Sequence, residues 1–387
     1  MEVFLVALRL GLTSFGGPVA HIGIFRDEYV RRRAWLDEAA FAELVALTAL
    51  LPGPSSSQLG IAIGTVRAGR LGGLAAWLGF TLPSAVALTA FALLVGPAEV
   101  VAAGWAHGLG LAAAAVVLSA VISMARTLAR GLPRLAIAAG SAAIALLAPG
   151  PVGQTLTIAV AAAVGGVLFR GDVLALGFGL RFPFSRRFAT GALATFAALL
   201  GGLPLLRGLV DWQALQLVWA FFRAGSLVFG GGHVVLPLLQ ESTVATGWVG
   251  EQAFLAGYGA AQAVPGPLFS FAAYLGAAGE PEPNGVAGAA IALGSIFLPS
   301  FLLIFGALPF WDQLRTSAGF RRALSGTNAA VVGILLAALI TPVWTSAVAG
   351  PLDVAIAALG LALLLTGRVP PIAVVALSAL LGQLVAL

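Results

Sequence analysis

Two helix-breaking motifs each occur twice in this chain. Phe-Gly-Gly stands at residues 15–17 and again at 229–231, and Pro-Gly-Pro stands at 52–54 and again at 265–267. All four copies lie in apolar segments of membrane length. Within a bilayer, broken helical backbone is tolerated only where it lines a cavity or is buried in protein. The pattern therefore predicts a duplicated membrane transporter.

The composition is that of a multi-pass membrane protein. Of 387 residues, 60% are hydrophobic and 9% are charged, with a mean hydropathy of +1.03. Apolar stretches of about 17 to 25 residues recur along the chain, which is the length of a membrane-spanning helix. The basic residues, all arginine, give a net charge of +5 but lie mostly at the ends of apolar stretches. We read them as determinants of topology in the lipid bilayer and expect no nucleic-acid partner.

Several classes of function are disfavoured by what the sequence lacks. There is no cysteine, which excludes disulfides and thiolate metal sites, and the three histidines are not spaced as a metal site. We therefore expect no metal and no cofactor. The P-loop pattern GxxxxGK[ST] is also absent, so a fused ATPase motor is not expected. The first apolar stretch, from Val3, contains Arg9 and leads into the first repeated motif, so we do not expect a cleaved signal peptide.

The duplication extends beyond the two motifs. Residues of distinctive chemistry recur at offsets between about 213 and 218, including Arg9 with Arg223, Trp35 with Trp248, Glu38 with Glu251, Ser84 with Ser300 and Gly108 with Gly326. Chance similarity between apolar stretches would match leucine and alanine instead. Residues from about 127 to 212 show no repeat. The sequence therefore predicts a first half at 1–187, a linker at 188–212 and a second half at 213–387.

The distribution of arginine indicates that the two halves face opposite ways. Arginines lie on both sides of the first Pro-Gly-Pro, at residues 26–33 and at 67–70, whereas the matching segments of the second half carry only glutamate. The next loop reverses the pattern, because residues 96–104 lack arginine and residues 312–322 contain three. The positive-inside rule then predicts an inverted-topology repeat, whose substrate site is expected near the membrane midplane between the halves.

The segments before and after each Pro-Gly-Pro carry the same kind of charge, and this indicates the path of the chain through the membrane. This favours a re-entrant hairpin of two half-helices that enters and leaves on one side of the membrane. A kinked but complete transmembrane helix is the alternative. The fold expected is all-α and polytopic, with about ten to thirteen transmembrane helices.

The motifs also resemble a known family. Residues 12–18 (Leu-Thr-Ser-Phe-Gly-Gly-Pro), Trp35 and the Pro-Gly-Pro at 52–54, together with the second-half motifs at 229–233 and 265–268, are similar to those of the chromate ion transporter family. The resemblance covers about 1–126 and 215–340, in the arrangement of the long, two-domain members. It implies a multi-pass protein of the inner (plasma) membrane that exports chromate, with sulfate as the anion of nearly identical chemistry.

The site expected for such an anion lies at the broken helices. A divalent tetrahedral oxyanion needs cationic donors and oriented N–H groups to replace its water. Arg9 and Arg223 occupy equivalent positions in apolar segments, where a charge is expensive and marks a functional candidate. Together they could hold one dianion. The alternative is that Arg9 reaches the membrane interface, and that Arg223 does likewise or pairs with a nearby acid.

The Gly pairs and the segments after Pro-Gly-Pro complete the expected site. A half-helix N-terminus presents free N–H groups to an anion, and the first copy adds hydroxyl and amide groups that the second copy replaces with Leu268 and Phe269. The first half is therefore expected to make the better polar contacts. The candidate substrate-binding residues are Arg9, Phe15, Gly16, Gly17, Pro52, Gly53, Pro54, Ser55, Ser56, Gln58, Arg223, Phe229, Gly230, Gly231, Pro265, Gly266 and Pro267. The candidates for proton coupling are Glu43, His21 and His233.

Three classes of function were weighed. A secondary transporter that exports chromate by alternating access is favoured, because inverted repeats with broken helices are typical of that mechanism. Transport of sulfate or another inorganic anion is the nearest alternative, and an anion channel is the next. An enzyme is not expected, because no cluster of catalytic residue types occurs at short spacing. The sequence leaves open whether the protein is a monomer or a homodimer.

Overall fold

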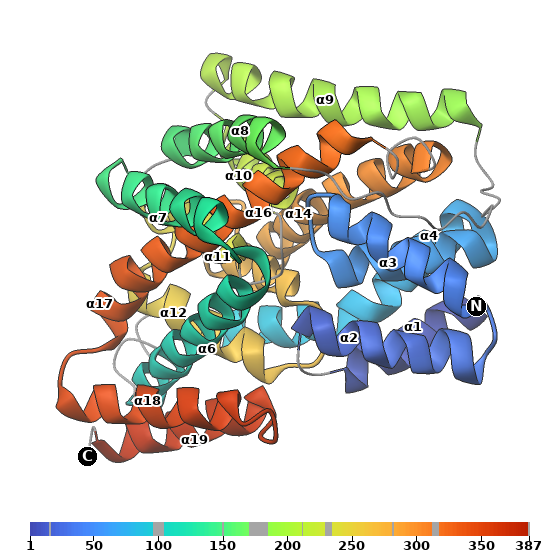
Figure 1. Cartoon of the computed structure of the whole chain (residues 1–387). Coiled ribbons are helices and arrows are strands. Elements are labelled where there is room, and N and C mark those ends of the chain that lie inside the picture. Colours follow the sequence, from blue (N-terminus) through green and yellow to red (C-terminus); the bar gives the residue numbers. More distant parts are fainter. Residues whose placement is uncertain are drawn as a thin grey trace.

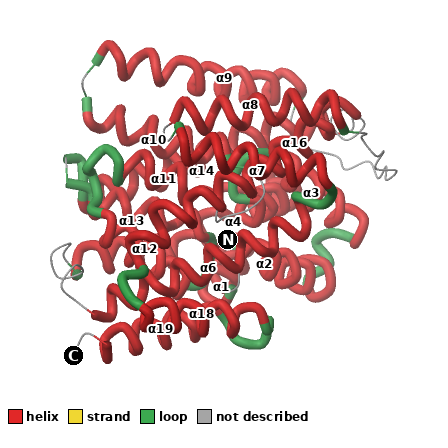
Figure 2. The backbone as a smooth tube through the Cα atoms, turned by 60° about the vertical axis from the view of Figure 1, so that its left-hand side comes forward, coloured by secondary structure: helices red, strands yellow, loops and turns green. Residues whose placement is uncertain are grey.

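The computed structural model describes residues 1–14, 17–95, 104–148, 151–169, 185–210, 212–228, 234–280, 282–311 and 317–385. Over these residues every regular element is a helix (Figures 1 and 2). The expected all-α fold is therefore confirmed.

The helices follow the breaks predicted from the sequence. Those before residue 210 are α1 (Glu2–Thr13), α2 (Gly17–Phe25), the π-helical η1 (Arg26–Arg32), α3 (Glu38–Leu50), α4 (Ser55–Leu94), α6 (Gly104–Leu128), α7 (Leu132–Leu147), α8 (Pro151–Leu168) and α9 (Arg186–Leu209). Those after it are α10 (Gln213–Leu227), α11 (Val235–Thr243), α12 (Glu251–Ala263), η3 (Leu268–Ser270), α13 (Phe271–Ala278), α14 (Gly285–Ala307), η4 (Leu308–Phe310), α16 (Ala318–Ala338), η5 (Leu339–Trp344), α17 (Thr345–Ala347), α18 (Pro351–Leu365) and α19 (Pro371–Val385). Helix α4 is interrupted at Ala68 and Gly69, whose backbone angles are not helical.

Ten apolar helices are found in the described part of the chain. Five are long enough to cross a membrane by themselves, and five shorter ones have 10–17 residues. The long helix α9 occupies most of the segment expected to be a linker, and only 17% of its apolar window is buried, against 72% for α6. Both views place α9 along the outer edge of the molecule (Figures 1 and 2). This segment is thus a membrane-length helix rather than an irregular connection.

The two halves pack together because one long helix of each half contacts helices of the other half. Helix α6 of the first half packs on α12, α18 and α19 of the second, and α16 of the second half packs on α7 and α8 of the first. Figure 1 shows both groups: α18 and α19 lie together beneath α6, and α7 and α8 lie beside α16.

Glycine allows these exchanged helices to meet backbone to backbone. A Cβ added at Gly165 of α8 would collide with Gly326 and with the Arg322 carbonyl of α16. A Cβ added at Gly382 of α19 would collide with the equivalent Gly108 and with the Gly104 carbonyl of α6. Helix α8 therefore stands to α16 as α19 stands to α6. The duplication extends through α8, past the point near residue 127 where it could be followed in the sequence.

Glycine also allows close contacts between the long helices near the centre. Gly11 of α1 abuts the Phe80 carbonyl of α4, and Gly225 of α10 abuts the Ile296 carbonyl of α14. These are equivalent contacts in the two halves. In lipid, where apolar side chains gain little by leaving the solvent, such close approach is the main source of attraction between helices.

We expect Gly225→Val to lower the free energy of unfolding by about 1–3 kcal/mol, because the added side chain overpacks the contact with α14. Gly294→Val is the matched control, since Gly294 lies on α14 with open space around it. Unfolding in detergent micelles, followed by tryptophan fluorescence, compares the two. Equal losses would contradict the role given to the Gly225 contact.

Candidate functional site

Both Pro-Gly-Pro motifs lie at breaks between helices. The Pro-Gly-Pro at 52–54 separates α3 from α4, and the one at 265–267 separates α12 from η3. Gly17, with φ of +74°, opens α2 after the first Phe-Gly-Gly. Phe15, Gly16, Phe229, Gly230, Gly231 and His233 lie outside the residues that the structure describes.

The breaks of the two halves are joined by reciprocal backbone hydrogen bonds. The Gly53 N–H donates to the Val228 carbonyl over 2.6 Å, and the Gly266 N–H donates to the Ser14 carbonyl over 2.9 Å. Ser14 and Val228 are the residues immediately before the two Phe-Gly-Gly motifs. Each Pro-Gly-Pro is thus hydrogen-bonded to the residue that precedes the Phe-Gly-Gly motif of the other half.

Only glycine suits the centre of each Pro-Gly-Pro. Gly53 has φ of +122° and Gly266 has φ of +108°, values that residues with a Cβ rarely adopt. Space is lacking as well: a Cβ on Gly53 would lie 3.1 Å from Ser300 Oγ, and one on Gly266 would lie 2.9 Å from Ser84 Oγ. Ser84 and Ser300 are themselves repeat equivalents, so each half also places one serine hydroxyl beside the other half's break.

Buried polar groups without a partner occur at both breaks, and Ser14 Oγ is one beside the second. Gln58 bonds Pro52 through its Nε2 (2.6 Å), while its Oε1 and the hydroxyls of Ser57 and Ser300 are buried without a hydrogen-bond partner. At the second break the Ser270 hydroxyl donates to the Pro267 carbonyl over 2.7 Å. Buried polar atoms are nearly always paired. The unpaired set at the first break therefore marks a place for a ligand or water.

The start of α4 adds backbone donors to this set. Pro54 is the N-cap residue and no side chain caps the helix, so the first N–H groups, beginning at Ser55 and Ser56, have no partner within the helix. The side chain of Ser56 is buried. Oriented N–H groups at such a terminus favour an anion.

The two equivalent arginines each pair with an acid of their own half. Arg223 is buried, and its Nη2 lies 3.1 Å from Glu241 Oε2. Arg9 is 56% exposed, and its Nη1 lies 3.9 Å from Glu28 Oε2. Both acids occur at a similar spacing from their arginine. Arg223 thus pairs with a nearby acid, as one alternative for that residue had it. Direct anion binding by either arginine stays a prediction.

Glu28 belongs to a larger ionic cluster at the end of η1. It accepts hydrogen bonds from Arg33 (2.7 Å) and Arg32 (3.2 Å), and Arg33 and Arg67 also pair with Glu2. Burial by itself would raise the pKa of Glu28, but the hydrogen bond from Arg33 and the charge of Arg32 lower it overall. The cluster brings together the start of α1, the end of η1 and the interruption of α4.

The two described proton-coupling candidates are buried. His21 is 1% exposed, and its Nε2 lies 3.3 Å from the Ser14 carbonyl, the same group that accepts the Gly266 N–H. Glu43 lies on the buried side of α3. His21 therefore touches the junction between the halves. No cluster of His, Asp or Glu suited to a metal ion occurs in the part of the chain that the structure describes.

Three residues of this site are not among the candidates drawn from the sequence. Ser57 has an unpaired hydroxyl in the first turn of α4, Ser300 reaches the first Pro-Gly-Pro from the other half, and Glu241 neutralises Arg223. The repeat of Ser84 at Ser300 is a visible signal for Ser300. The similar spacing of Arg9 to Glu28 and of Arg223 to Glu241 is a signal for Glu241.

Comparison with known proteins decides the family. The family model described as Chromate transporter matches residues 1–203 and 215–383, which are two regions of similar length. The chain belongs to the chromate transporter family. Both matched regions contain one Phe-Gly-Gly and one Pro-Gly-Pro, so the family assignment and the paired breaks concern the same residues. The resemblance seen in the sequence is confirmed.

Named relatives cover most of the chain. A chromate transport protein of Pseudomonas aeruginosa is 32% identical over 352 residues, which are 86% of this chain and 79% of the relative. A chromate transport protein of Cupriavidus metallidurans is 27% identical, over 88% and 81% of the two chains. An uncharacterised transporter of Methanocaldococcus jannaschii is 25% identical, over 88% and 83%. No solved structure matches the chain.

We expect Arg223→Gln to lower the free energy of unfolding by about 3 kcal/mol, because Glu241 is left buried without its cation. Arg9→Gln is the matched control and should cost less than about 1 kcal/mol, since Glu28 keeps Arg32 and Arg33 and Arg9 is exposed. Denaturant unfolding in micelles measures both. Adding Glu241→Gln to Arg223→Gln should recover part of the loss, and a further loss would contradict the pairing.

Proposed function

We propose that this protein is a secondary transporter that exports chromate across the plasma membrane by alternating access. The observation that carries the proposal is that the Pro-Gly-Pro break of each half is hydrogen-bonded to the other half, in a region with unpaired buried polar groups. Family membership and relatives named chromate transport protein support a chromate transport role. Export, its mechanism and the inner membrane are part of the proposal.

The ends of the hairpins support an inverted arrangement of the halves. Arg67 lies over the Trp35 ring at 5.2 Å in the first half, and the Glu280 N–H bonds to the Trp248 carbonyl over 2.9 Å in the second. These residues occupy equivalent positions, yet one half carries arginine where the other carries glutamate. By the positive-inside rule the first cluster faces the cytoplasm and the second faces the outside.

Helix lengths support the re-entrant path. Helices α3 and α12 have 13 residues each, or about 20 Å at 1.5 Å per residue. This is short of the hydrocarbon thickness of about 30 Å but past its middle. Hairpins that enter from opposite faces would therefore meet with their tips near the midplane. Helix α9, with 24 residues, would cross once and carry the chain from the cytoplasmic side to the outside.

The chemistry of the first break suits an oxyanion. Hydroxyls of Ser57 and Ser300 and the N–H groups at the start of α4 can all donate to chromate oxygens, and none of these groups carries a negative charge. Donors that are already in place replace the water that the anion loses. Arg9 and Arg223, each paired with a glutamate of its own half, would fix the position of neighbouring helices rather than bind the anion directly. His21 or Glu43 would carry the coupling proton.

Uptake of labelled chromate into inside-out vesicles tests this function. Ser57→Ala should raise KM for chromate about tenfold, because one hydrogen bond to a charged acceptor contributes about 1.5 kcal/mol. Ser270→Ala, at the equivalent position, should leave KM unchanged, since that hydroxyl is bonded to Pro267. If the unmodified protein takes up no chromate, chromate is not its substrate. If sulfate competes with a higher affinity than chromate, sulfate is the preferred substrate.

A separate experiment tests the topology. Single cysteines replacing Arg31 in η1 and Thr246 after α11 can be labelled with an impermeant maleimide in intact cells, because the chain has no cysteine of its own. Both side chains are exposed and therefore accessible to the reagent. We expect labelling at position 246 and protection at position 31. Labelling of both from the same side would contradict the inverted arrangement.

A further inference from the structure

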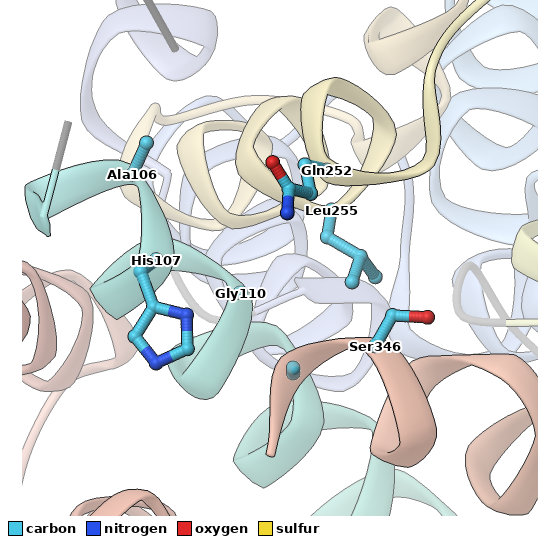
Figure 3. Close-up of a pocket in the computed structure, with 7 residues that line it drawn as sticks. Ala106, His107, Gly110, Gln252, Leu255 and Ser346 are labelled. Atoms are coloured by element: carbon cyan, nitrogen blue, oxygen red, sulfur yellow. The ribbon is translucent and has the colours of Figure 1, made fainter. Parts of the chain in front are cut away.

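A polar cavity lies where the first half meets the second, away from the repeated motifs. Its volume is about 90 Å³. The lining residues are Ala106, His107 and Gly110 from α6, Gln252 and Leu255 from α12, and Ser346 and Ala347 from α17 (Figure 3). A volume of about 10–15 Å³ in this measure holds one water, so the cavity has room for several waters or one small polar ion.

His107 is held in one orientation by an acid behind it. Its Nε2 lies 2.8 Å from Asp353 Oδ1, and Asp353 Oδ2 accepts the N–H groups of Ala349 (2.8 Å) and Gly350 (3.1 Å). A buried carboxyl that accepts two backbone N–H groups is ionised, so Nε2 carries a proton and donates it to Asp353. Figure 3 shows the other ring nitrogen on the side of Gln252 and Ser346.

The groups that face this cavity can all donate hydrogen bonds. Gln252 offers its amide N–H₂, Ser346 its hydroxyl and protonated His107 its Nδ1–H. No carboxylate is among the lining residues. A ligand with several acceptors and negative charge matches such a set, whereas a cation does not. We propose that this cavity binds a small inorganic oxyanion when His107 is protonated, as a second anion site of the transporter.

The charges around His107 define how the site depends on pH. Helix α6 packs against α12, α16, α17, α18, α19 and η5. The ionisable groups that these elements carry are Glu251 on α12, Arg321 and Arg322 on α16, and Asp353 on α18, while α6 itself carries Arg126. Among the contacts that the structure describes, Asp353 is the group bonded to His107. Glu251 precedes Gln252 without lining the cavity, so its charge opposes an anion and keeps the affinity modest.

The position of the cavity gives it a role in transport. His107 belongs to the first half, and Gln252, Ser346 and Asp353 belong to the second. An anion bound here bridges the halves, and the half-exposed His107 connects it to solvent. In the topology proposed above, the arginine-free segments beside Gln252 and Asp353 face outward. The site would then hold the anion at the outer end of its path. This role and the identity of the anion rest on the proposed function.

Histidine NMR tests the site directly. The chain has three histidines, so imidazole ¹⁵N labelling of the full-length protein in micelles gives few signals, which single His→Gln variants assign. Sulfate is the probe, because its charge is constant around neutral pH. We expect sulfate to shift the Nδ1 signal of His107. His21, which is 1% exposed, should not respond. Binding should weaken as the pH is raised, because the proposed site requires an imidazolium.

Matched variants separate a built site from general charge attraction. Gln252→Leu should weaken sulfate binding about tenfold through loss of one donor to an anion, and Ser346→Ala serves if that variant does not fold. Glu251→Gln, which removes a charge but no lining group, should tighten binding. A His107 signal that does not shift when sulfate is added would overturn the site. So would Gln252→Leu and Ser346→Ala variants that bind sulfate as tightly as the unmodified protein. Chromate transport that persists in that case leaves the proposed function standing, whereas sulfate binding without any chromate transport overturns the proposed function alone.

Discussion

Two backbone hydrogen bonds, from Gly53 to Val228 and from Gly266 to Ser14, hold the centre of this structure together. An interrupted helix leaves N–H and C=O groups without partners, and away from water each such group is costly. Here the donor of one half's break meets the acceptor of the other's. Neither half can satisfy its own breaks in this way, so the halves depend on each other at the point where both are least regular.

Helix packing follows the same reciprocity. Gly108 and Gly382 bring α6 against α19, and Gly326 and Gly165 bring α16 against α8. One long helix of each half therefore packs against helices of the other half. Because lipid offers no hydrophobic drive for helices to associate, close backbone contact at small residues has to supply the attraction. A chain with 50 glycines is suited to that requirement.

The scaffold is nearly symmetric, but its chemistry is not. The same Arg-Glu pair stands exposed within an ionic cluster in the first half and buried in the second. Ser57 has an unused hydroxyl where Ser270 is bonded to Pro267, and Gln58 stands where the second half has Phe271. Duplication supplied two copies of the broken helix, and divergence changed the polar side chains around each copy.

The membrane class, the helical fold, the duplication and the location of the breaks can all be predicted from the sequence. These follow from composition, from the length of apolar stretches and from the backbone chemistry of glycine and proline, all of which act locally. Other features are visible in the tertiary structure alone. Each Pro-Gly-Pro bonds to the opposite half, Ser300 lies beside Gly53, and His107 pairs with Asp353, 246 residues away. The tertiary structure also showed that α7 and α8 belong to the repeat, because their partners are equivalent although their residues have diverged. Such contacts depend on which distant segments come within about 3 Å of each other, and a single sequence gives no local signal for that.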